Sequence, residues 1–318
     1  MIRTRGLTKR FQRPGNKGKN GGPAETLAVD ALDLEVREGE VFAFLGPNGA
    51  GKTTTVRMLA CLIAPSAGEA WVNGHKVGAE SDTIRSEVGI LTESPGLYER
   101  LSAYQNLDIY GRLYGVADTD RRQRVRELLE LLELWDRRDD LAGSFSKGMK
   151  QKLAIARALL HHPKALFLDE PTAGLDPEAA KVVRDFIGEL KKEGRTIFLC
   201  THNLDEADRL ADRIGIMRQR LIQVDTPANL RRALYGRQVA FQLKAPAQSY
   251  LPVVKGLGFV KEVTADDNRL VIDLDKPEEQ NPVLVKALVQ AGAEVQYVTD
   301  VKHSLEEVYF SLIREEQA

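Results

Sequence analysis

The sequence predicts an α/β fold with a largely parallel sheet, followed by a smaller α+β domain. Short apolar runs rich in Val, Ile and Phe alternate with helical patterns through most of the chain. This alternation is typical of parallel strands connected by helices. After about Tyr235 the pattern changes to several short strands with two intervening helices. We therefore expect a first domain over residues 1–234 and an accessory domain over residues 235–318.

The elements of the first domain follow from apolar runs and from helical periodicity. Val41–Leu45 is predicted to be a strand, and Gly51–Ile63 the helix that follows it. Leu166–Asp169 and Thr196–Thr201 are predicted to be buried strands, separated by a helix over Pro177–Lys192.

Between about residues 93 and 161 the strand signals vanish. Tyr104–Tyr114, Arg121–Leu134 and Ser146–Leu160 are helical in period and heavily charged, which predicts a helical subdomain inserted into the α/β core. Near the start of the chain, Arg13–Glu25 is rich in Gly, Pro, Asn and Lys. That composition predicts a loop or a disordered tongue.

The accessory domain is predicted to be ferredoxin-like, with a βαββαβ order and a final helix over Ser304–Arg314. Its predicted strands and helices are, in order, Gln238–Leu243, Gln248–Leu257, Lys261–Ala265, Arg269–Leu274, Pro282–Ala291 and Glu294–Val298.

The composition excludes several classes of function. Lys plus Arg (45) nearly balance Asp plus Glu (46), so no large basic field points to a nucleic-acid partner. The two cysteines, Cys61 and Cys200, have no metal or disulfide spacing and indicate thiols in a reducing compartment. No apolar stretch approaches the roughly 20 residues that span a bilayer, and no signal peptide is visible, so we expect a soluble chain.

A phosphate-binding loop lies between the first predicted strand and helix. The segment GPNGAGKT fits G-x-x-x-x-G-K-[ST] in full, and the strand–helix context is the one this motif requires. Lys52 is expected to reach the β and γ phosphates of ATP, and Thr53 to bind Mg²⁺. The alternative is a glycine-rich turn with an incidental Lys-Thr pair. The predicted ATP contacts on this loop are Gly46, Pro47, Asn48, Gly49, Ala50, Gly51, Lys52, Thr53 and Thr54.

Candidate functional residues also follow two further predicted strands. Asp169 and Glu170 end an apolar strand, where adjacent carboxylates are costly unless they meet a cation or a positioned water. Asp169 is expected to hold Mg²⁺ and Glu170 to accept the proton of an attacking water; the alternative is an acidic surface turn. His202 follows the strand Thr196–Thr201, where ligands bind parallel sheets. We expect it to contact the γ-phosphate rather than to be a packed or solvated histidine.

With these motifs, residues 1–234 resemble an ATP-binding cassette (ABC) ATPase. The segment Phe145–Leu159 is similar to the family signature, and it is followed by Leu168–Pro171, Ala173–Asp176 and His202 in the family's order and spacing. The resemblance implies a P-loop NTPase with a RecA-like core, an antiparallel β portion and an inserted helical subdomain. It also implies that Glu170, His202 and Lys52 are catalytic.

The signature indicates a site shared between two chains. Ser146 is a favourable N-cap for the helix that follows it, and with the amides near Gly148 it makes an anion site at a helix N-terminus. In the family this site faces the γ-phosphate held by a second cassette, so two ATP molecules lie between two subunits, in a homodimer or a heterodimer. The residues that the resemblance assigns to this contact in trans are Ser146, Lys147, Gly148 and Asp176.

Three positions depart from the family pattern or leave it open. The signature reads Phe-Ser-Lys-Gly-Met, and Lys147 either adds a positive charge or faces solvent. Glu93 stands where the family usually has Gln; its carboxylate can still reach ATP, Mg²⁺ or a water. Phe11 is the aromatic expected to stack on adenine, with packing in the core as the alternative.

The segments Gly96–Ser102, Tyr104–Gly115 and His303–Tyr309 resemble the branch that serves type-2 exporters of drugs, sodium and lipids. That resemblance implies an ATP-hydrolysing subunit that works on the inner face of the cell membrane with an integral-membrane permease. Residues 93–114 would contact the permease, or else form a solvated surface. The alternative function is a soluble ABC ATPase in translation or repair, or a regulatory ATPase without transport. A single cassette, the lack of coiled-coil heptads and the intact site residues oppose these alternatives.

Overall fold

The computed structural model describes residues 1–17, 23–301 and 303–315. The chain divides into two compact units, Met1–Thr226 and Pro227–Ala318. The helix α8 (Pro227–Tyr235) falls in the second unit, where it packs against the last helix, α11 (Leu305–Glu315).

The centre of the first unit is a six-stranded sheet with the order β10-β9-β3-β8-β7-β6. All neighbouring strands are parallel except β10, which pairs antiparallel with β9. Val, Ile, Leu and Phe dominate β3, β7 and β8, as expected for strands that are buried on both faces. The strands are β3 (Val41–Leu45), β6 (Val88–Leu91), β7 (Ala165–Asp169), β8 (Thr196–Thr201), β9 (Arg213–Arg218) and β10 (Arg220–Asp225).

The register of these strands brings distant parts of the sequence to one edge of the sheet. Leu45 pairs with Thr201, and Asp169 pairs with Cys200. Because the strands run in parallel, the segments that follow β3, β7 and β8 leave the sheet at the same edge. Ligands bind at this edge in open α/β sheets.

Four helices of the first unit lie outside the helical subdomain: α1 (Lys52–Leu59), α2 (Ser81–Glu87), α6 (Pro177–Lys192) and α7 (Leu204–Leu210). The helix predicted over Gly51–Ile63 is shorter than expected. It ends at Leu59, because Cys61 takes a left-handed backbone conformation (φ 58°) and the amides of Leu62 and Ile63 both turn back to the Arg57 carbonyl.

A second sheet of the first unit is antiparallel, with the order β2-β1-β4-β5. It consists of β1 (Ile2–Lys17), β2 (Pro23–Val36), β4 (Ala67–Val72) and β5 (His75–Lys76). The loop or disordered tongue predicted over Arg13–Glu25 is wrong for residues 13–17 and 23–25, because pairs such as Arg13–Ala24 extend the β1–β2 hairpin. The remainder of that prediction, residues 18–22, lies outside the described residues.

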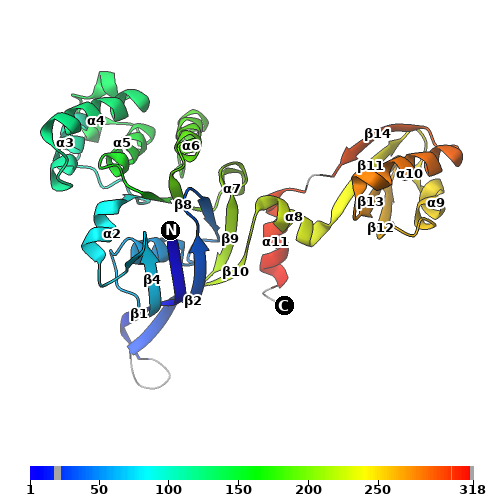
Figure 1. The fold of residues 1–318 in the computed structure, drawn as a ribbon, viewed down its shortest axis with the longest axis horizontal. Coiled ribbons are helices and arrows are strands. Elements are labelled where there is room, and N and C mark those ends of the chain that lie inside the picture. Colours follow the sequence, from blue (N-terminus) through cyan, green and yellow to red (C-terminus); the bar gives the residue numbers. More distant parts are fainter. Residues whose placement is uncertain (18–22, 302, 316–318) are drawn as a thin grey trace. The chain divides into compact units, whose positions relative to one another are not determined.

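The predicted helical subdomain is present. Figure 1 shows its three helices gathered in one group: α3 (Ala103–Leu113), α4 (Asp118–Leu131) and α5 (Lys147–Leu159), which pack against one another. Two 3₁₀ turns, Trp135–Arg137 and Ala142–Ser144, connect α4 to α5. Arg157 of α5 donates a hydrogen bond to the Gly96 carbonyl (2.9 Å), and its guanidinium lies 4.9 Å from the centre of the Tyr110 ring.

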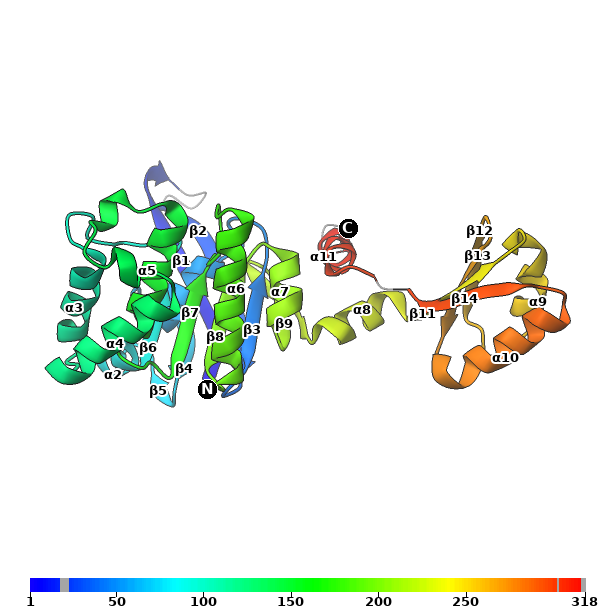
Figure 2. The ribbon, with the colours of Figure 1, turned by 90° about the horizontal axis from the view of Figure 1, so that it is seen from above.

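The second unit has an antiparallel sheet with the order β12-β13-β11-β14, and α9 and α10 cover one of its faces (Figure 2). The predicted helix over Gln248–Leu257 is a 3₁₀ turn, Ala247–Tyr250, followed by α9. The helix predicted to start at Pro282 starts at Pro277, which occupies the first turn, where proline is tolerated. The elements are β11 (Arg237–Leu243), α9 (Leu251–Lys255), β12 (Glu262–Asp266), β13 (Arg269–Leu274), α10 (Pro277–Gln290) and β14 (Val295–Asp300).

Within the described ranges, no helix combines the length and the apolar character needed to cross a membrane.

Candidate active site

The phosphate loop joins β3 to α1, and its lysine donates hydrogen bonds to backbone carbonyls of the same loop. Lys52 is 6% exposed, and its ammonium donates hydrogen bonds to the carbonyls of Gly46 (2.6 Å) and Pro47 (3.3 Å). Gly51 has a φ of 98°, and a Cβ there would lie 2.3 Å from the Ala28 carbonyl oxygen. Only glycine combines a left-handed backbone with the absence of a Cβ, so the shape of the loop requires glycine at this position.

Asp169 lies at the buried end of β7. Its side chain is 1% exposed, and neither carboxylate oxygen has a partner that meets hydrogen-bond geometry among the described residues. Burial raises the pKa of Asp169 above its ordinary value, and the neighbouring charge of Glu170 adds to this, while Thr53 and Lys52 oppose it. A buried carboxylate is costly unless it meets a cation or a polar partner, so Asp169 is suited to hold a cation.

Glu170 stands between the phosphate loop and the end of β8. One carboxylate oxygen lies 3.9 Å from the Lys52 ammonium, and the other lies 2.8 Å from Nδ1 of His202. The backbone of Glu170 is left-handed (φ 52°), which is uncommon for a residue other than glycine. Such conformations gather at functional sites, where the surrounding structure holds them.

His202 leaves the sheet just after β8, and its side chain is largely exposed. The next residue, Asn203, caps α7: its side chain accepts a hydrogen bond from the Glu206 amide (3.1 Å). This cap ends the strand and starts the helix within two residues, which leaves His202 at the mouth of the site.

A cavity of about 600 Å³ opens over the phosphate loop. It brings together six of the predicted residues on or near that loop and three predicted on other elements, Glu93, Glu170 and His202. Five lining residues were not predicted: Thr26, Leu27 and Ala28 from β2, Ala173, and Gln219. Ala28 could have been inferred only from the fold, because its carbonyl closes over Gly51. Gln219 is likewise placed by backbone pairing, since its amide donates to the Ala50 carbonyl (2.8 Å).

The cavity is not lined by four other predicted residues: Gly46, Pro47, Ala50 and Asp169. Phe11 does not line it either. It is 42% exposed, pairs across the hairpin with Thr26, and has the Lys9 ammonium 5.1 Å from its ring centre.

The residues predicted to act in trans lie at two helix starts and not in this cavity. The Ser146 hydroxyl caps α5 by accepting a hydrogen bond from the Met149 amide (3.2 Å), and Asp176 caps α6 by accepting from the Ala179 amide (2.8 Å). Gly148 is buried, and a Cβ there would lie 2.9 Å from the Ala179 Cβ. Lys147 is exposed, and its ammonium lies over Gly174, 2.1 Å from where a Cβ would be.

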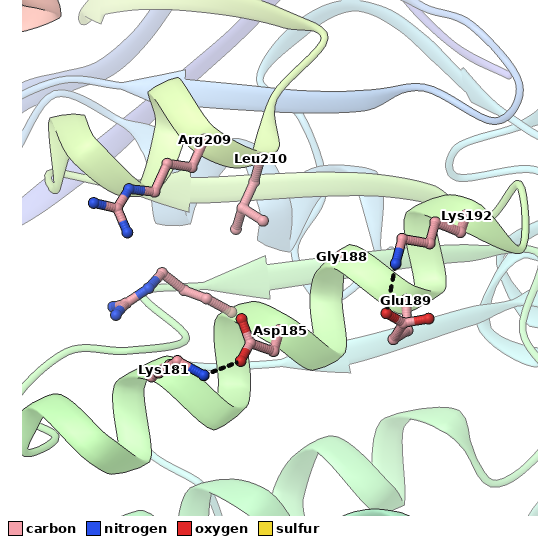
Figure 3. Close-up of a pocket in the computed structure, with 8 residues that line it drawn as sticks. Lys181, Asp185, Gly188, Glu189, Lys192, Arg209 and Leu210 are labelled. Atoms are coloured by element: carbon pink, nitrogen blue, oxygen red, sulfur yellow. Dashed lines mark hydrogen bonds and ion pairs between the residues drawn. The ribbon is translucent and has the colours of Figure 1, made fainter.

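A second cavity, of about 540 Å³, lies between α6 and α7 and is lined mostly by charged side chains. Figure 3 shows Lys181 directed at Asp185 and Lys192 directed at Glu189, and both pairs are hydrogen-bonded. This cavity contains none of the residues of the phosphate loop or of the strand ends, several of which line the first cavity.

Comparison with known proteins shows the family of this chain. Residues 29–173 match the family model described as ABC transporter. The chain is 38% identical, over 90% of its length and 88% of the relative's, to the daunorubicin/doxorubicin resistance ATP-binding protein DrrA of Streptomyces peucetius. It is 35% identical, over 98% of its length and 97% of the relative's, to the bacitracin transport ATP-binding protein BcrA of Bacillus licheniformis.

Two solved structures share the fold of the first unit. An ATP-binding subunit of an ABC transporter matches with a TM-score of 0.64 and 30% identity, covering 74% of this chain and 94% of its own. The dimeric bacterial ABC transporter cassette MJ0796 matches with a TM-score of 0.64 and 26% identity, covering 71% of this chain and 98% of its own. The chain therefore belongs to the family of ABC transporter ATP-binding proteins.

Proposed function

We propose that this chain hydrolyses ATP at the cavity over the phosphate loop and that hydrolysis drives a membrane exporter. The observation that carries the hydrolytic part is the position of Glu170, whose two carboxylate oxygens approach Lys52 and His202. Attack of water on a γ-phosphate needs a base for the water and positive charge at the phosphate. Glu170 and Lys52 provide these groups at one cavity, together with His202.

Each of the three residues has a distinct role in this proposal. Glu170 accepts the proton of the attacking water. His202 holds the carboxylate of Glu170 in place and contacts the γ-phosphate. Lys52 exchanges its hydrogen bonds to the Gly46 and Pro47 carbonyls for the β and γ phosphates, which are stronger partners because they are charged.

The residues around Asp169 fit a magnesium ion. Its two buried oxygens have no partner that meets hydrogen-bond geometry among the described residues, and Thr53 and Glu93 line the cavity over the phosphate loop. Carboxylate and hydroxyl oxygens are the donors that Mg²⁺ prefers. We propose that Asp169, Thr53 and Glu93 hold the ion, which would supply charge neutralisation at the phosphates.

Phe11 is our proposed adenine contact. Its exposed ring lies on β1 directly across from Thr26, which lines the cavity. An exposed aromatic face beside a nucleotide cavity can stack on a base.

We further propose that two such chains, or this chain and a second ATP-binding subunit, enclose two ATP molecules. Ser146, Lys147, Gly148 and Asp176 lie away from the cavity of their own chain, at the starts of α5 and α6. Helix N-termini bind anions, so these residues are suited to the γ-phosphate of a partner. The dimeric cassette among the solved structures supports this arrangement.

The relatives support export as the direction of transport. Their names refer to resistance to daunorubicin and doxorubicin and to bacitracin transport. We propose that this chain works with an integral-membrane permease of the type-2 exporter kind, on the cytoplasmic face of the membrane. No relative reported above favours a soluble ABC ATPase of translation or repair.

The test is Glu170→Gln in the purified full chain. Loss of a general base lowers turnover by about 10²–10⁴, and we expect ATP affinity to stay within about threefold because Gln preserves the shape of the side chain. The variant is expected to form dimers with ATP on a sizing column. The matched control is Glu189→Gln, an exposed glutamate of α6, which should leave turnover unchanged. Wild-type turnover in Glu170→Gln would refute the proposed role of Glu170.

A further inference from the structure

A second buried glutamate lies behind the active site and has no part in the steps above. Glu206, in the first turn of α7, is 1% exposed. Its Oε1 accepts a hydrogen bond from the Thr172 hydroxyl (3.0 Å), while its Oε2 has no partner meeting hydrogen-bond geometry among the described residues. Burial raises the pKa of Glu206, and the Thr201 and Thr172 hydroxyls oppose that effect.

The two threonines beside Glu206 belong to the two segments that carry the catalytic pair. Thr172 lies two residues after Glu170, and Thr201 immediately precedes His202. Glu206 is itself fixed at the start of α7, because its amide donates to the Asn203 side chain and the Asn203 amide donates to the Thr201 hydroxyl (3.0 Å). One buried carboxyl thus connects the end of β7 to the end of β8.

The turn after Glu170 needs such support. Glu170 has a left-handed backbone (φ 52°), which persists only when neighbouring contacts hold it. The Pro171 carbonyl accepts a hydrogen bond from the side chain of Gln151 (2.8 Å), a buried residue of α5. Glu206 provides a second side-chain anchor for the same turn, from α7.

We propose that Glu206 is a positioning residue for ATP hydrolysis: through the Thr172 hydroxyl it holds the turn that presents Glu170 to His202. This inference rests on the hydrolytic function proposed above. A buried carboxyl at position 206 is costly, and an apolar side chain would fill the same space without that cost. The hydrogen bond to Thr172 is what Glu206 provides and an apolar side chain would not.

The experiment measures kcat and KM for ATP in the full chain. Thr172→Val removes the hydroxyl and keeps the shape, and Glu206→Leu removes the carboxyl. Each is expected to lower kcat about tenfold, because a lost hydrogen bond misplaces the base, while KM changes less than about twofold. Glu206→Gln keeps an acceptor for Thr172 and should retain kcat within about threefold.

Two controls separate positioning from packing. Thr172→Val combined with Glu206→Leu should be no slower than the worse single variant, because both remove the same contact. Thr4→Val removes a buried threonine hydroxyl that donates to the Leu32 carbonyl (2.8 Å), and neither of these two residues lines the cavity. It should lower the melting temperature and leave kcat unchanged.

The inference is overturned if Thr172→Val keeps wild-type kcat, if Glu206→Gln is as slow as Glu206→Leu, or if the losses of kcat multiply in the double variant. If Glu206→Leu does not fold, Thr172→Val and Glu206→Gln still decide the matter. If Glu170→Gln abolishes hydrolysis while Thr172→Val keeps the wild-type kcat, this inference is overturned and the proposed function stands. A wild-type chain with no hydrolysis that depends on Glu170 overturns the proposed function, and this inference with it.

Discussion

Replacing Asp169 by Asn should stabilise the chain in the absence of nucleotide and metal. Its carboxylate is 1% exposed, and neither oxygen has a partner that meets hydrogen-bond geometry among the described residues. An unsatisfied buried polar group costs about 1–3 kcal/mol, and more when it is charged. Asn removes the charge but leaves a buried amide, so we expect a gain of about 1–2 kcal/mol. For a domain of this size that gain raises the melting temperature by roughly 2–8 °C.

The pH dependence of this gain has a definite sign. The pKa of Asp169 is raised in the folded state, mainly by burial, so the folded chain holds this proton more tightly than the unfolded chain. The stability contributed by Asp169 therefore falls as pH rises from the ordinary aspartate range through the raised folded value. The advantage of Asn should be full at pH 8 and should disappear at acid pH, where aspartate is protonated in both states.

The assay is thermal unfolding of the full chain in EDTA, from pH 8 down to the acid range. Asp185→Asn is the matched control, because Asp185 is an exposed aspartate on α6 paired with Lys181 (2.8 Å). Exposed pairs contribute little, so the control should change the free energy of unfolding by less than about 1 kcal/mol. With Mg²⁺ and ATP added, wild type should become more stable than Asp169→Asn, because only wild type keeps the carboxylate ligand. An Asp169→Asn variant less stable than wild type at pH 8 without nucleotide would refute the reasoning.

Three other substitutions test the remaining parts of the site. Lys52→Ala should weaken ATP binding by about 10–100-fold, as measured by calorimetry, because it removes a charge-assisted contact to the phosphates; unchanged affinity would remove Lys52 from the phosphate site. Glu93→Gln should alter the Mg²⁺ concentration at half-maximal hydrolysis by about threefold or more, because it removes one negative charge beside the proposed ion; unchanged rate and Mg²⁺ dependence would place Glu93 outside the site. Gly51→Ala should lower the free energy of unfolding by about 2–3 kcal/mol, since its backbone is left-handed and a Cβ would lie 2.3 Å from the Ala28 carbonyl; equal denaturant midpoints would contradict that strain.

Three strands of the parallel core, β3, β7 and β8, could be predicted because each contains a continuous apolar run, whereas β6, β9 and β10 were not predicted. Val41–Leu45 and Thr196–Thr201 form strands with the expected bounds. The antiparallel sheet gave no such signal. β1 carries charged residues along its length and is interrupted by Gly6, and β2 starts in a segment whose Gly and Pro content indicated a loop. The pairing of Arg13 with Ala24 arises from cross-strand register, which a local pattern does not contain.

The candidate site shows the same division. Lys52, Glu170 and His202 could be found because each follows an apolar strand, and parallel register then brings them to one edge of the sheet. Thr26, Leu27, Ala28 and Gln219 could not, because they reach the cavity through backbone contacts between the two sheets. No feature of their side chains marks them.

The hydrogen bond from Arg157 to Gly96 has a mechanical consequence. Gly96 lies three residues after Glu93, at the beginning of the segment that resembles an exporter's permease contact, and Ser146 caps the same helix that carries Arg157. The 13 residues of α5 span roughly 20 Å. In the arrangement proposed above, a displacement at Gly96 would pass through Arg157 to the Ser146 end of α5, so this helix would link the permease contact to the ATP of the neighbouring chain.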